Sequence, residues 1–115
     1  MMKIIISCLP EDTEFINAAK RAFKESASIE SYTMSGVTGY NMLMLILTAA
    51  SAVGAMGALI VEFVNMYMTK NKDDNVKSQR SISIEMSDKR IIKLECEGCS
   101  EETVRDIVEN ILGKL

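Results

Sequence analysis

The sequence predicts a single α+β domain over residues 1–115, with a small sheet of three or four strands, two amphipathic helices and one long hydrophobic central helix. Three observations lead to this prediction. The chain begins with the unbroken isoleucine run Ile4 to Ile6, which is typical of a strand buried on both faces. No charged side chain occurs between Glu30 and Glu62, and the last third alternates between apolar and polar residues before an amphipathic ending. A chain of 115 residues with 48% hydrophobic content has room for one core.

The first third of the chain predicts a strand, a helix and a weaker strand. Met2 to Leu9 is the predicted first strand, and Pro10 opens a helix over Glu11 to Glu25. This helix has acidic residues in its first turn and basic residues in its last, as the helix dipole favours. Ile29 to Met34 is the weaker strand, and a glycine-containing loop follows it. The apolar residues at helical spacing are Phe15, Ile16, Ala19, Ala22 and Phe23, and the loop glycines are Gly36 and Gly39.

The uncharged middle of the chain predicts one long hydrophobic helix over about residues 41–69. Its most apolar part, Met42 to Val61, has about the length needed to cross a bilayer. A straight helix of this span would measure about 43 Å. A compact domain of this size is only about 35 Å across. We therefore expect the helix to protrude or to bend, and the pair Gly54 and Gly57 is the expected bend.

On this predicted helix, small and polar residues form one stripe, and large apolar residues form the opposite face. We expect the apolar face to pack on the sheet and the stripe to face water or a second subunit. Glu62 is interpreted as the first solvated residue where the helix emerges, rather than as a buried functional acid. The stripe runs from Asn41 and Met44 to Thr69, its predicted interface residues are Thr48, Ser51, Ala55, Ala58, Glu62 and Asn65, and the apolar face carries Leu43, Ile46, Val53, Ile60 and Val64.

Three interpretations of this helix stay open: a core helix, an assembly helix between proteins, and a membrane span. A span would place the N-terminal strand and the C-terminal strands on opposite sides of the membrane, where they could not pair. Insertion is also weakly favoured, because only eight of the twenty residues from Met42 to Val61 are Leu, Ile or Val. The first residues do not resemble a secretory signal, so the expected location is the cytoplasm, with membrane association as the alternative.

The last third predicts a hairpin and a helix. The charged tract Lys70 to Lys77 is a surface loop, and the hairpin turns at Ser87 to Lys89. The final helix starts at about Ser100. The inward-facing residues are Ile82, Ile84 and Met86 on one strand, Ile92, Leu94 and Cys96 on the other, and Val104, Ile107, Val108, Ile111 and Leu112 on the helix.

No catalytic constellation is visible, and no cofactor is expected. The chain has no histidine, which removes the commonest general base. The formal charge of −3 and the sparse aromatic residues disfavour nucleic-acid binding. Cys96 and Cys99 form a Cys-x-x-Cys pair before a helix, and this spacing is similar to the loop of heavy-metal-associated domains. They are weak metal candidates only, because a structural zinc site needs about four ligands, and Cys8 is interpreted as a core residue.

The pattern as a whole resembles the effector-associated constant component 1 family, small proteins of bacterial conflict systems. The residues that carry the resemblance are Gly36 and Gly39, the apolar stretch Met42 to Val64, the hairpin segments Arg80 to Glu85 and Asp88 to Ile92, and the terminal helix from Glu101. The family often has Asp-Gly at the hairpin turn, where this chain has Asp88 and Lys89, and the cysteine pair is a second departure.

This resemblance implies a non-enzymatic accessory or adaptor protein of a bacterial defence system, which works beside a separate effector. We expect it to assemble through the long helix with itself or with that effector. One alternative is a small single-span membrane effector that oligomerises and perturbs the membrane. Another is a thiol enzyme or metal carrier that uses Cys96 and Cys99.

Overall fold

A computed structural model describes residues 2–35, 41–49, 53–69, 74–86 and 88–114. In chain order the described elements are β1 (Met2–Cys8), α1 (Thr13–Phe23), β2 (Ser28–Ser35), β3 (Asn41–Ala49), α2 (Val53–Tyr67), the 3-10 turn η1 (Lys77–Gln79), β4 (Ser81–Glu85), β5 (Ile91–Lys93) and α3 (Glu101–Leu112).

The strands form one sheet in the order β2-β3-β1-β4-β5, and every neighbouring pair is antiparallel. β1 is central, which agrees with its isoleucine run. From β1 to β4 the elements follow the order β-α-β-β-α-β, which is the connectivity of the ferredoxin-like, or split βαβ, motif. β5 and α3 extend this motif, and the predicted α+β class is confirmed.

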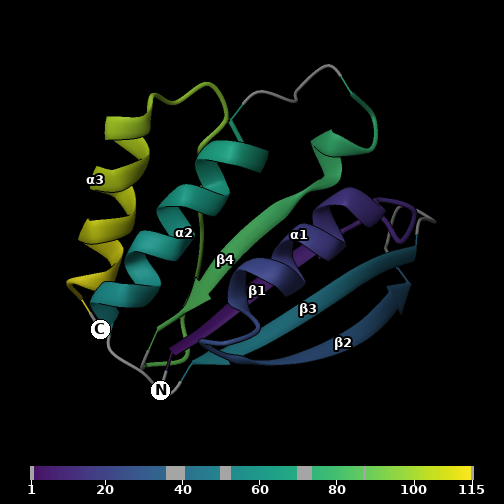
Figure 1. Cartoon of the computed structure of the whole chain (residues 1–115), viewed down its shortest axis with the longest axis horizontal. Helices are drawn as coiled ribbons and strands as arrows, with labels where there is room; N and C mark the ends of the chain where they lie inside the picture. Colours follow the sequence, from purple (N-terminus) through teal and green to yellow (C-terminus); the bar gives the residue numbers. More distant parts are fainter. Residues whose placement is uncertain (1, 36–40, 50–52, 70–73, 87, 115) are drawn as a thin grey trace.

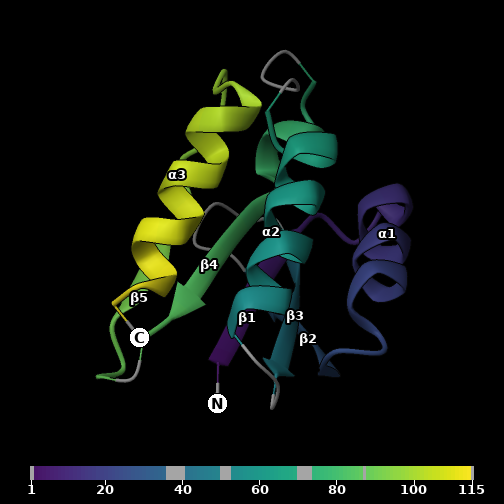
Figure 2. The same ribbon diagram turned by 60° about the vertical axis from the view of Figure 1, so that its left-hand side comes forward.

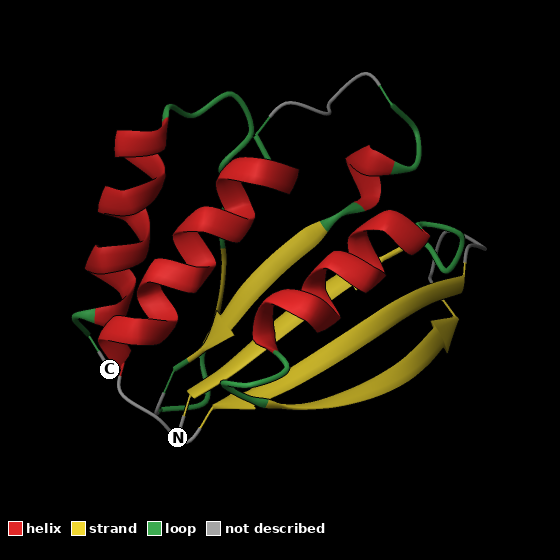
Figure 3. Ribbon diagram, viewed as in Figure 1, coloured by secondary structure: helices red, strands yellow, loops and turns green. Residues whose placement is uncertain are grey.

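The described helices pack on one face of the sheet, so the molecule has two layers (Figures 1 and 3). Figure 2 shows α2 between α3 and α1. Alternate residues of β1 point to opposite faces of the sheet, and the two faces differ in exposure. Ile4 and Ile6 have no exposed surface, whereas Ile5 between them is half-buried. We call the helix-packed side the covered face and the other side the open face. The covered face of the central strands is formed by Ile4, Ile6, Leu45, Leu47, Ile82 and Ile84.

Aromatic rings join α1 to α2 above the sheet. The Phe15 and Phe63 ring centroids are 5.2 Å apart, and those of Phe23 and Phe63 are 5.5 Å apart. Tyr67 completes the cluster at 5.1 Å from Phe63. Offset and edge-on ring contacts of this kind add to the stabilisation from burial. The amphipathic pattern predicted for the first helix is therefore confirmed, with bounds of 13–23 instead of 11–25.

The prediction of one long helix over 41–69 is wrong. Residues Asn41–Ala49 form β3, which pairs with β1 over residues 43–49 on one side and with β2 on the other. Both faces of β3 are apolar, so the alternation that marks a strand is hidden. A central strand completes the hydrogen bonds of two neighbours, and this pairing decides the structure of the segment.

Only the second part of the predicted helix is helical, as α2. Ile60 and Val64 face the core as expected, together with Met56. Gly54 and Gly57 lie at the start of α2, which begins at Val53, so the long helix in which they were expected to form a bend does not exist. A Cβ on Gly57 would lie 2.9 Å from Leu112 Cδ1, which indicates that this glycine permits close packing of α3. Among the described residues, no helix has the length and apolarity needed to cross a membrane.

The remaining elements agree more closely with the sequence. The weak strand at 29–34 is β2, and the predicted hairpin is β4 with a short β5. At its turn Lys89 has φ of 73°, a left-handed conformation that glycine adopts more easily. The final helix starts at Glu101, with the Ser100 side chain accepting a hydrogen bond from the Thr103 N–H as its N-cap. The sheet has five strands rather than the predicted three or four, because residues 41–49 form a strand and not part of a helix.

Candidate functional site

The six predicted interface residues do not share one surface. Thr48 lies in β3 on the open face, and Ser51 lies outside the described residues. Ala55, Ala58 and Glu62 are exposed on α2, and Asn65 is half-buried on the same helix. The exposure of Glu62 agrees with its interpretation as a solvated residue. Two surfaces therefore have to be considered, one on each layer of the molecule.

The first surface is a groove between α2 and α3, which run antiparallel. Leu112 packs against Gly57 at one end of the pair. At the other end the Gly98 N–H donates a hydrogen bond to the Thr69 carbonyl, 3.0 Å away. Between these two contacts the solvent side encloses about 790 Å³, lined by Gly57, Ala58, Val61, Glu62, Asn65, Met66, Glu101, Arg105, Glu109, Leu112 and Gly113. We call it the α2–α3 groove.

The floor of the α2–α3 groove is apolar and its rims are charged. Val61 and Leu112 are buried at the floor, while Met66 on the α2 rim is 64% exposed. Glu101, Arg105 and Glu109 follow one another at four-residue spacing, so they form a straight row on α3. With Glu62 on α2, the groove carries three carboxylates and one guanidinium.

The second surface is the open face of the sheet. Register places Ile46 between Ile5 and Glu30 on the neighbouring strands, and Met44 between Ser7 and Tyr32. Tyr32 and Met34 are each 47% exposed, although large apolar side chains are usually covered. We define the open-face patch as the apolar residues of β1, β2 and β3 on this side: Ile5, Tyr32, Met34, Met42, Met44 and Ile46.

Charged groups flank the open-face patch on both sides. On β2, Glu30 accepts a hydrogen bond from the Tyr32 hydroxyl, and this bond raises the pKa of Tyr32. On β1, Lys3 lies opposite Glu85 of β4 in the register. The patch therefore has Glu30 on its outer side, and Lys3 with the neighbouring Glu85 on its inner side.

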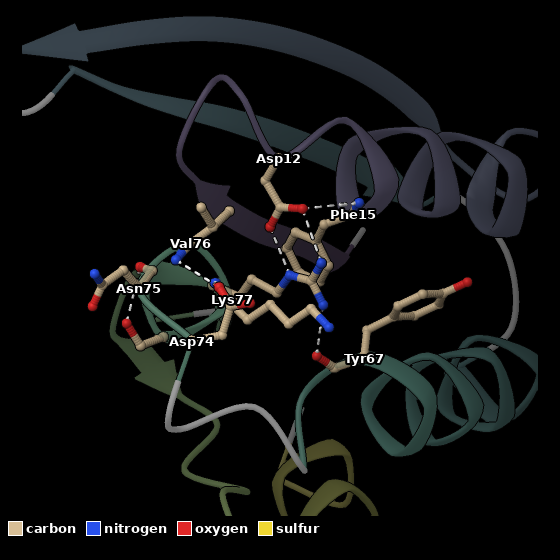
Figure 4. Close-up of polar contacts among 9 residues, drawn as sticks. Asp12, Phe15, Tyr67, Asp74, Asn75, Val76 and Lys77 are labelled. Atoms are coloured by element: carbon tan, nitrogen blue, oxygen red, sulfur yellow. Dashed lines mark hydrogen bonds and ion pairs between the residues drawn. The ribbon is translucent and has the colours of Figure 1, made fainter.

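A buried ion pair fixes the helices to the sheet, and sequence analysis missed it. Arg80 Nε lies 2.6 Å from Asp12 Oδ2, both side chains are almost fully buried, and the guanidinium lies 4.8 Å from the centre of the Phe15 ring (Figure 4). Arg80 Nη1 also donates to the Tyr67 carbonyl, 3.2 Å away. Burial lowers the pKa of Arg80, and the Asp12 carboxylate outweighs this and raises it.

This ion pair is structural, because its hydrogen-bonding groups are taken up within the protein. Asp12 is also the N-cap of α1 and accepts from the Phe15 N–H. The pair thus joins the start of α1, the end of α2 and the residue before β4. The N-cap role of Asp12 was readable from its position before an amphipathic helix. Its partner, 68 residues away, had no sequence signal.

Two of the three cysteines have raised thiol pKa values. Cys8 and Cys96 are buried, and burial raises the pKa of each thiol to about 11. A reactive or metal-binding thiol needs a lowered pKa. Cys99 is half-buried at the end of the Cys-x-x-Cys pair. Within the part of the chain that the structure describes, no three His, Cys, Asp or Glu residues gather as metal ligands.

No family model matches this chain, and neither a curated protein nor a solved structure resembles it significantly.

Proposed function

We propose that the chain is a non-enzymatic accessory or adaptor protein of a bacterial conflict system, which assembles with copies of itself and with a separate effector. The effector and the biological setting follow from the resemblance to the effector-associated constant component 1 family. Within that resemblance, the hairpin and the terminal helix have the expected structure, whereas residues 42–64 contain a strand and a helix. Self-association is supported by one observation, the open-face patch.

A second copy of this chain is the occupant that fits the patch. Glu30 and Lys3 lie on opposite sides of β3, one strand away from it in each direction. A two-fold axis parallel to β3, placed between two stacked open faces, exchanges these two sides. Glu30 of one copy then faces Ile5 of the other copy, and Lys3 is the next residue of β1 on the same face, so its long side chain can reach the Glu30 carboxylate. Such self-complementarity is what a two-fold interface requires.

The size of the open face agrees with a dimer interface. Strands about 4.8 Å apart and about 20–25 Å long give a five-stranded face on the order of 500 Å² in projection, before side-chain relief is added. A standard interface uses about 800 Å² per partner. A dimer on this side therefore needs nearly the whole open face, and an effector would have to bind elsewhere.

The test is the mass of the full chain in solution, measured by sizing with light scattering across a range of concentrations. Met44→Glu places a charge in the centre of the patch and should give a monomer. Ser31→Glu is the matched control, since Ser31 is an exposed residue of β2 that points to the covered side. Both variants should keep the circular dichroism spectrum of the parent.

A charge exchange tests the two-fold arrangement itself. Glu30→Lys and Lys3→Glu each place like charges together and should weaken the dimer, whereas the double variant should restore it. A monomeric parent chain at high concentration would refute self-association. An oligomer that is insensitive to Met44→Glu would show that the copies meet on another surface.

A further inference from the structure

The geometry points to the α2–α3 groove as the docking site for an amphipathic helix of a partner protein, with an apolar stripe flanked by lysine or arginine. This inference goes beyond the self-association proposed above and uses the other layer of the molecule. It concerns a site built by residues from α2 and α3, which are far apart in the chain and are joined at both ends of the groove.

Charge selects a basic partner. Glu62 lies on one rim, and Glu101 and Glu109 lie on the other, with Arg105 as the single base. None of these four groups forms an ion pair or side-chain hydrogen bond with another residue that the structure describes. Their carboxylates are therefore free to pair with cations on a ligand, and an acidic ligand would be repelled.

The shape of the groove selects a helix over an extended peptide. Both walls are helices whose backbone groups are already hydrogen-bonded along α2 and α3. An extended segment lying in the groove would find no regular backbone partners there, and unpaired backbone groups are costly to bury. A helix brings its own backbone bonds and needs only an apolar stripe to fill the floor.

The apolar contacts are also suited to an inserted helix. The small side chain of Ala58 leaves room along α2, and Val61 and Leu112 form the floor. Met66 is the most exposed of the large apolar side chains that the structure describes. An unbranched methionine on a rim adapts to the shape of a docked side chain.

The probe is a synthetic helical peptide of about four turns with leucines at i, i+3, i+4 and i+7 and lysines on both flanks. A second peptide carries glutamates in place of the lysines. Binding is measured by fluorescence anisotropy with the full chain, in the Met44→Glu background so that self-association does not contribute. We expect saturable binding of the lysine peptide, weakened by added salt, and no comparable binding of the glutamate peptide.

The matched variant is Glu62→Lys with Glu109→Lys, and the control is Glu25→Lys, an exposed residue after α1. The double variant should bind the lysine peptide about tenfold or more weakly, and it should gain binding of the glutamate peptide. The control should leave both unchanged. Amide shift changes caused by the lysine peptide should map to Ala58, Arg105 and Glu109.

Equal binding of the two peptides, or shift changes confined to the open face, would overturn the inference. In the parent background, a change in oligomeric state caused by the groove variant would assign the groove to a second copy instead. Self-association is judged separately from the mass of the parent chain, so the two proposals fail independently.

Discussion

The two faces of the sheet are built from the same strands, yet they differ in what their residues do. On the covered face, Ile4 and Ile6 are fully buried beneath the helices. On the open face, Ile5 stands between them on the same strand and is only half-buried. Packing in the core accounts for the apolar residues on the covered face. The fold itself does not require the apolar side chains on the other side, and the proposed self-association rests on them.

The largest loss of stability is expected when the buried ion pair between Asp12 and Arg80 is broken. Arg80→Ala leaves the Asp12 carboxylate buried without its partner and should lower the free energy of unfolding by about 3–5 kcal/mol. Urea denaturation measures this change. Arg90→Ala removes the exposed pair with Asp88, whose two side chains are 70% and 53% exposed, and should change stability little. Similar losses from both variants would contradict the structural role of the buried pair.

Alanine substitutions of two isoleucines of β1 compare the two faces of the sheet directly. Ile6→Ala on the covered face should destabilise the chain by about 2–5 kcal/mol, because it leaves a cavity in the core. Ile5→Ala on the open face should lower the stability of the monomer by about 1 kcal/mol or less. It should, however, weaken the proposed dimer. Thermal unfolding at low and high protein concentration separates these effects, and equal losses in the monomer would mean that the open face is also part of the core.

Thiol labelling compares the two buried cysteines with the half-buried Cys99. Cys8 and Cys96 have pKa values raised to about 11, so near neutral pH only a small fraction of either thiol is ionised. Cys99, which is half-buried, should react first with a thiol reagent, and the other two should react only on unfolding. Mass spectrometry after timed labelling, with Cys99→Ser as control, gives the order. Rapid labelling of Cys96 in the folded chain would revive the redox interpretation.

The raised pKa values of Cys8 and Cys96 also predict that the stability of the chain depends on pH. Their pKa is raised on folding, so the unfolded chain loses these protons at a lower pH than the folded chain does. Their contribution to stability is complete below about pH 9 and falls as the pH rises towards about 11. Stability measured across this range should therefore decrease, and Cys8→Ala should reduce the slope.

The smallest effect concerns the edge of the open face. The hydrogen bond and the negative charge of Glu30 raise the pKa of Tyr32. Glu30→Gln removes the charge, so this pKa should fall towards its ordinary value. Ultraviolet titration of the tyrosines follows the change, with Glu85→Gln as a control on the same face. An unchanged titration would show that the Tyr32 hydroxyl is not bonded to Glu30 in solution.

The sequence by itself determined the elements whose periodicity was clear. The first strand follows from its unbroken isoleucine run. Both amphipathic helices and the first strand of the C-terminal hairpin follow from patterns of three to four or of two residues, because one face of each is polar. The N-cap Ser100 likewise follows from local hydrogen bonding. These features depend on neighbours a few residues apart, and a linear sequence displays such neighbours directly.

Tertiary structure alone decided the middle of the chain and the composition of both surfaces. Residues 41–49 and 53–61 are similarly apolar and uncharged, yet the first segment is a strand because β1 and β2 offer it backbone partners on both sides. For this reason the prediction of one stripe on one helix is wrong. Its helical spacing runs across both β3 and α2, so Thr48 lies in the strand whereas Ala58 and Glu62 lie in the helix. The groove and the Asp12–Arg80 pair also join distant segments, and the free energy of such contacts depends on packing that no local pattern records.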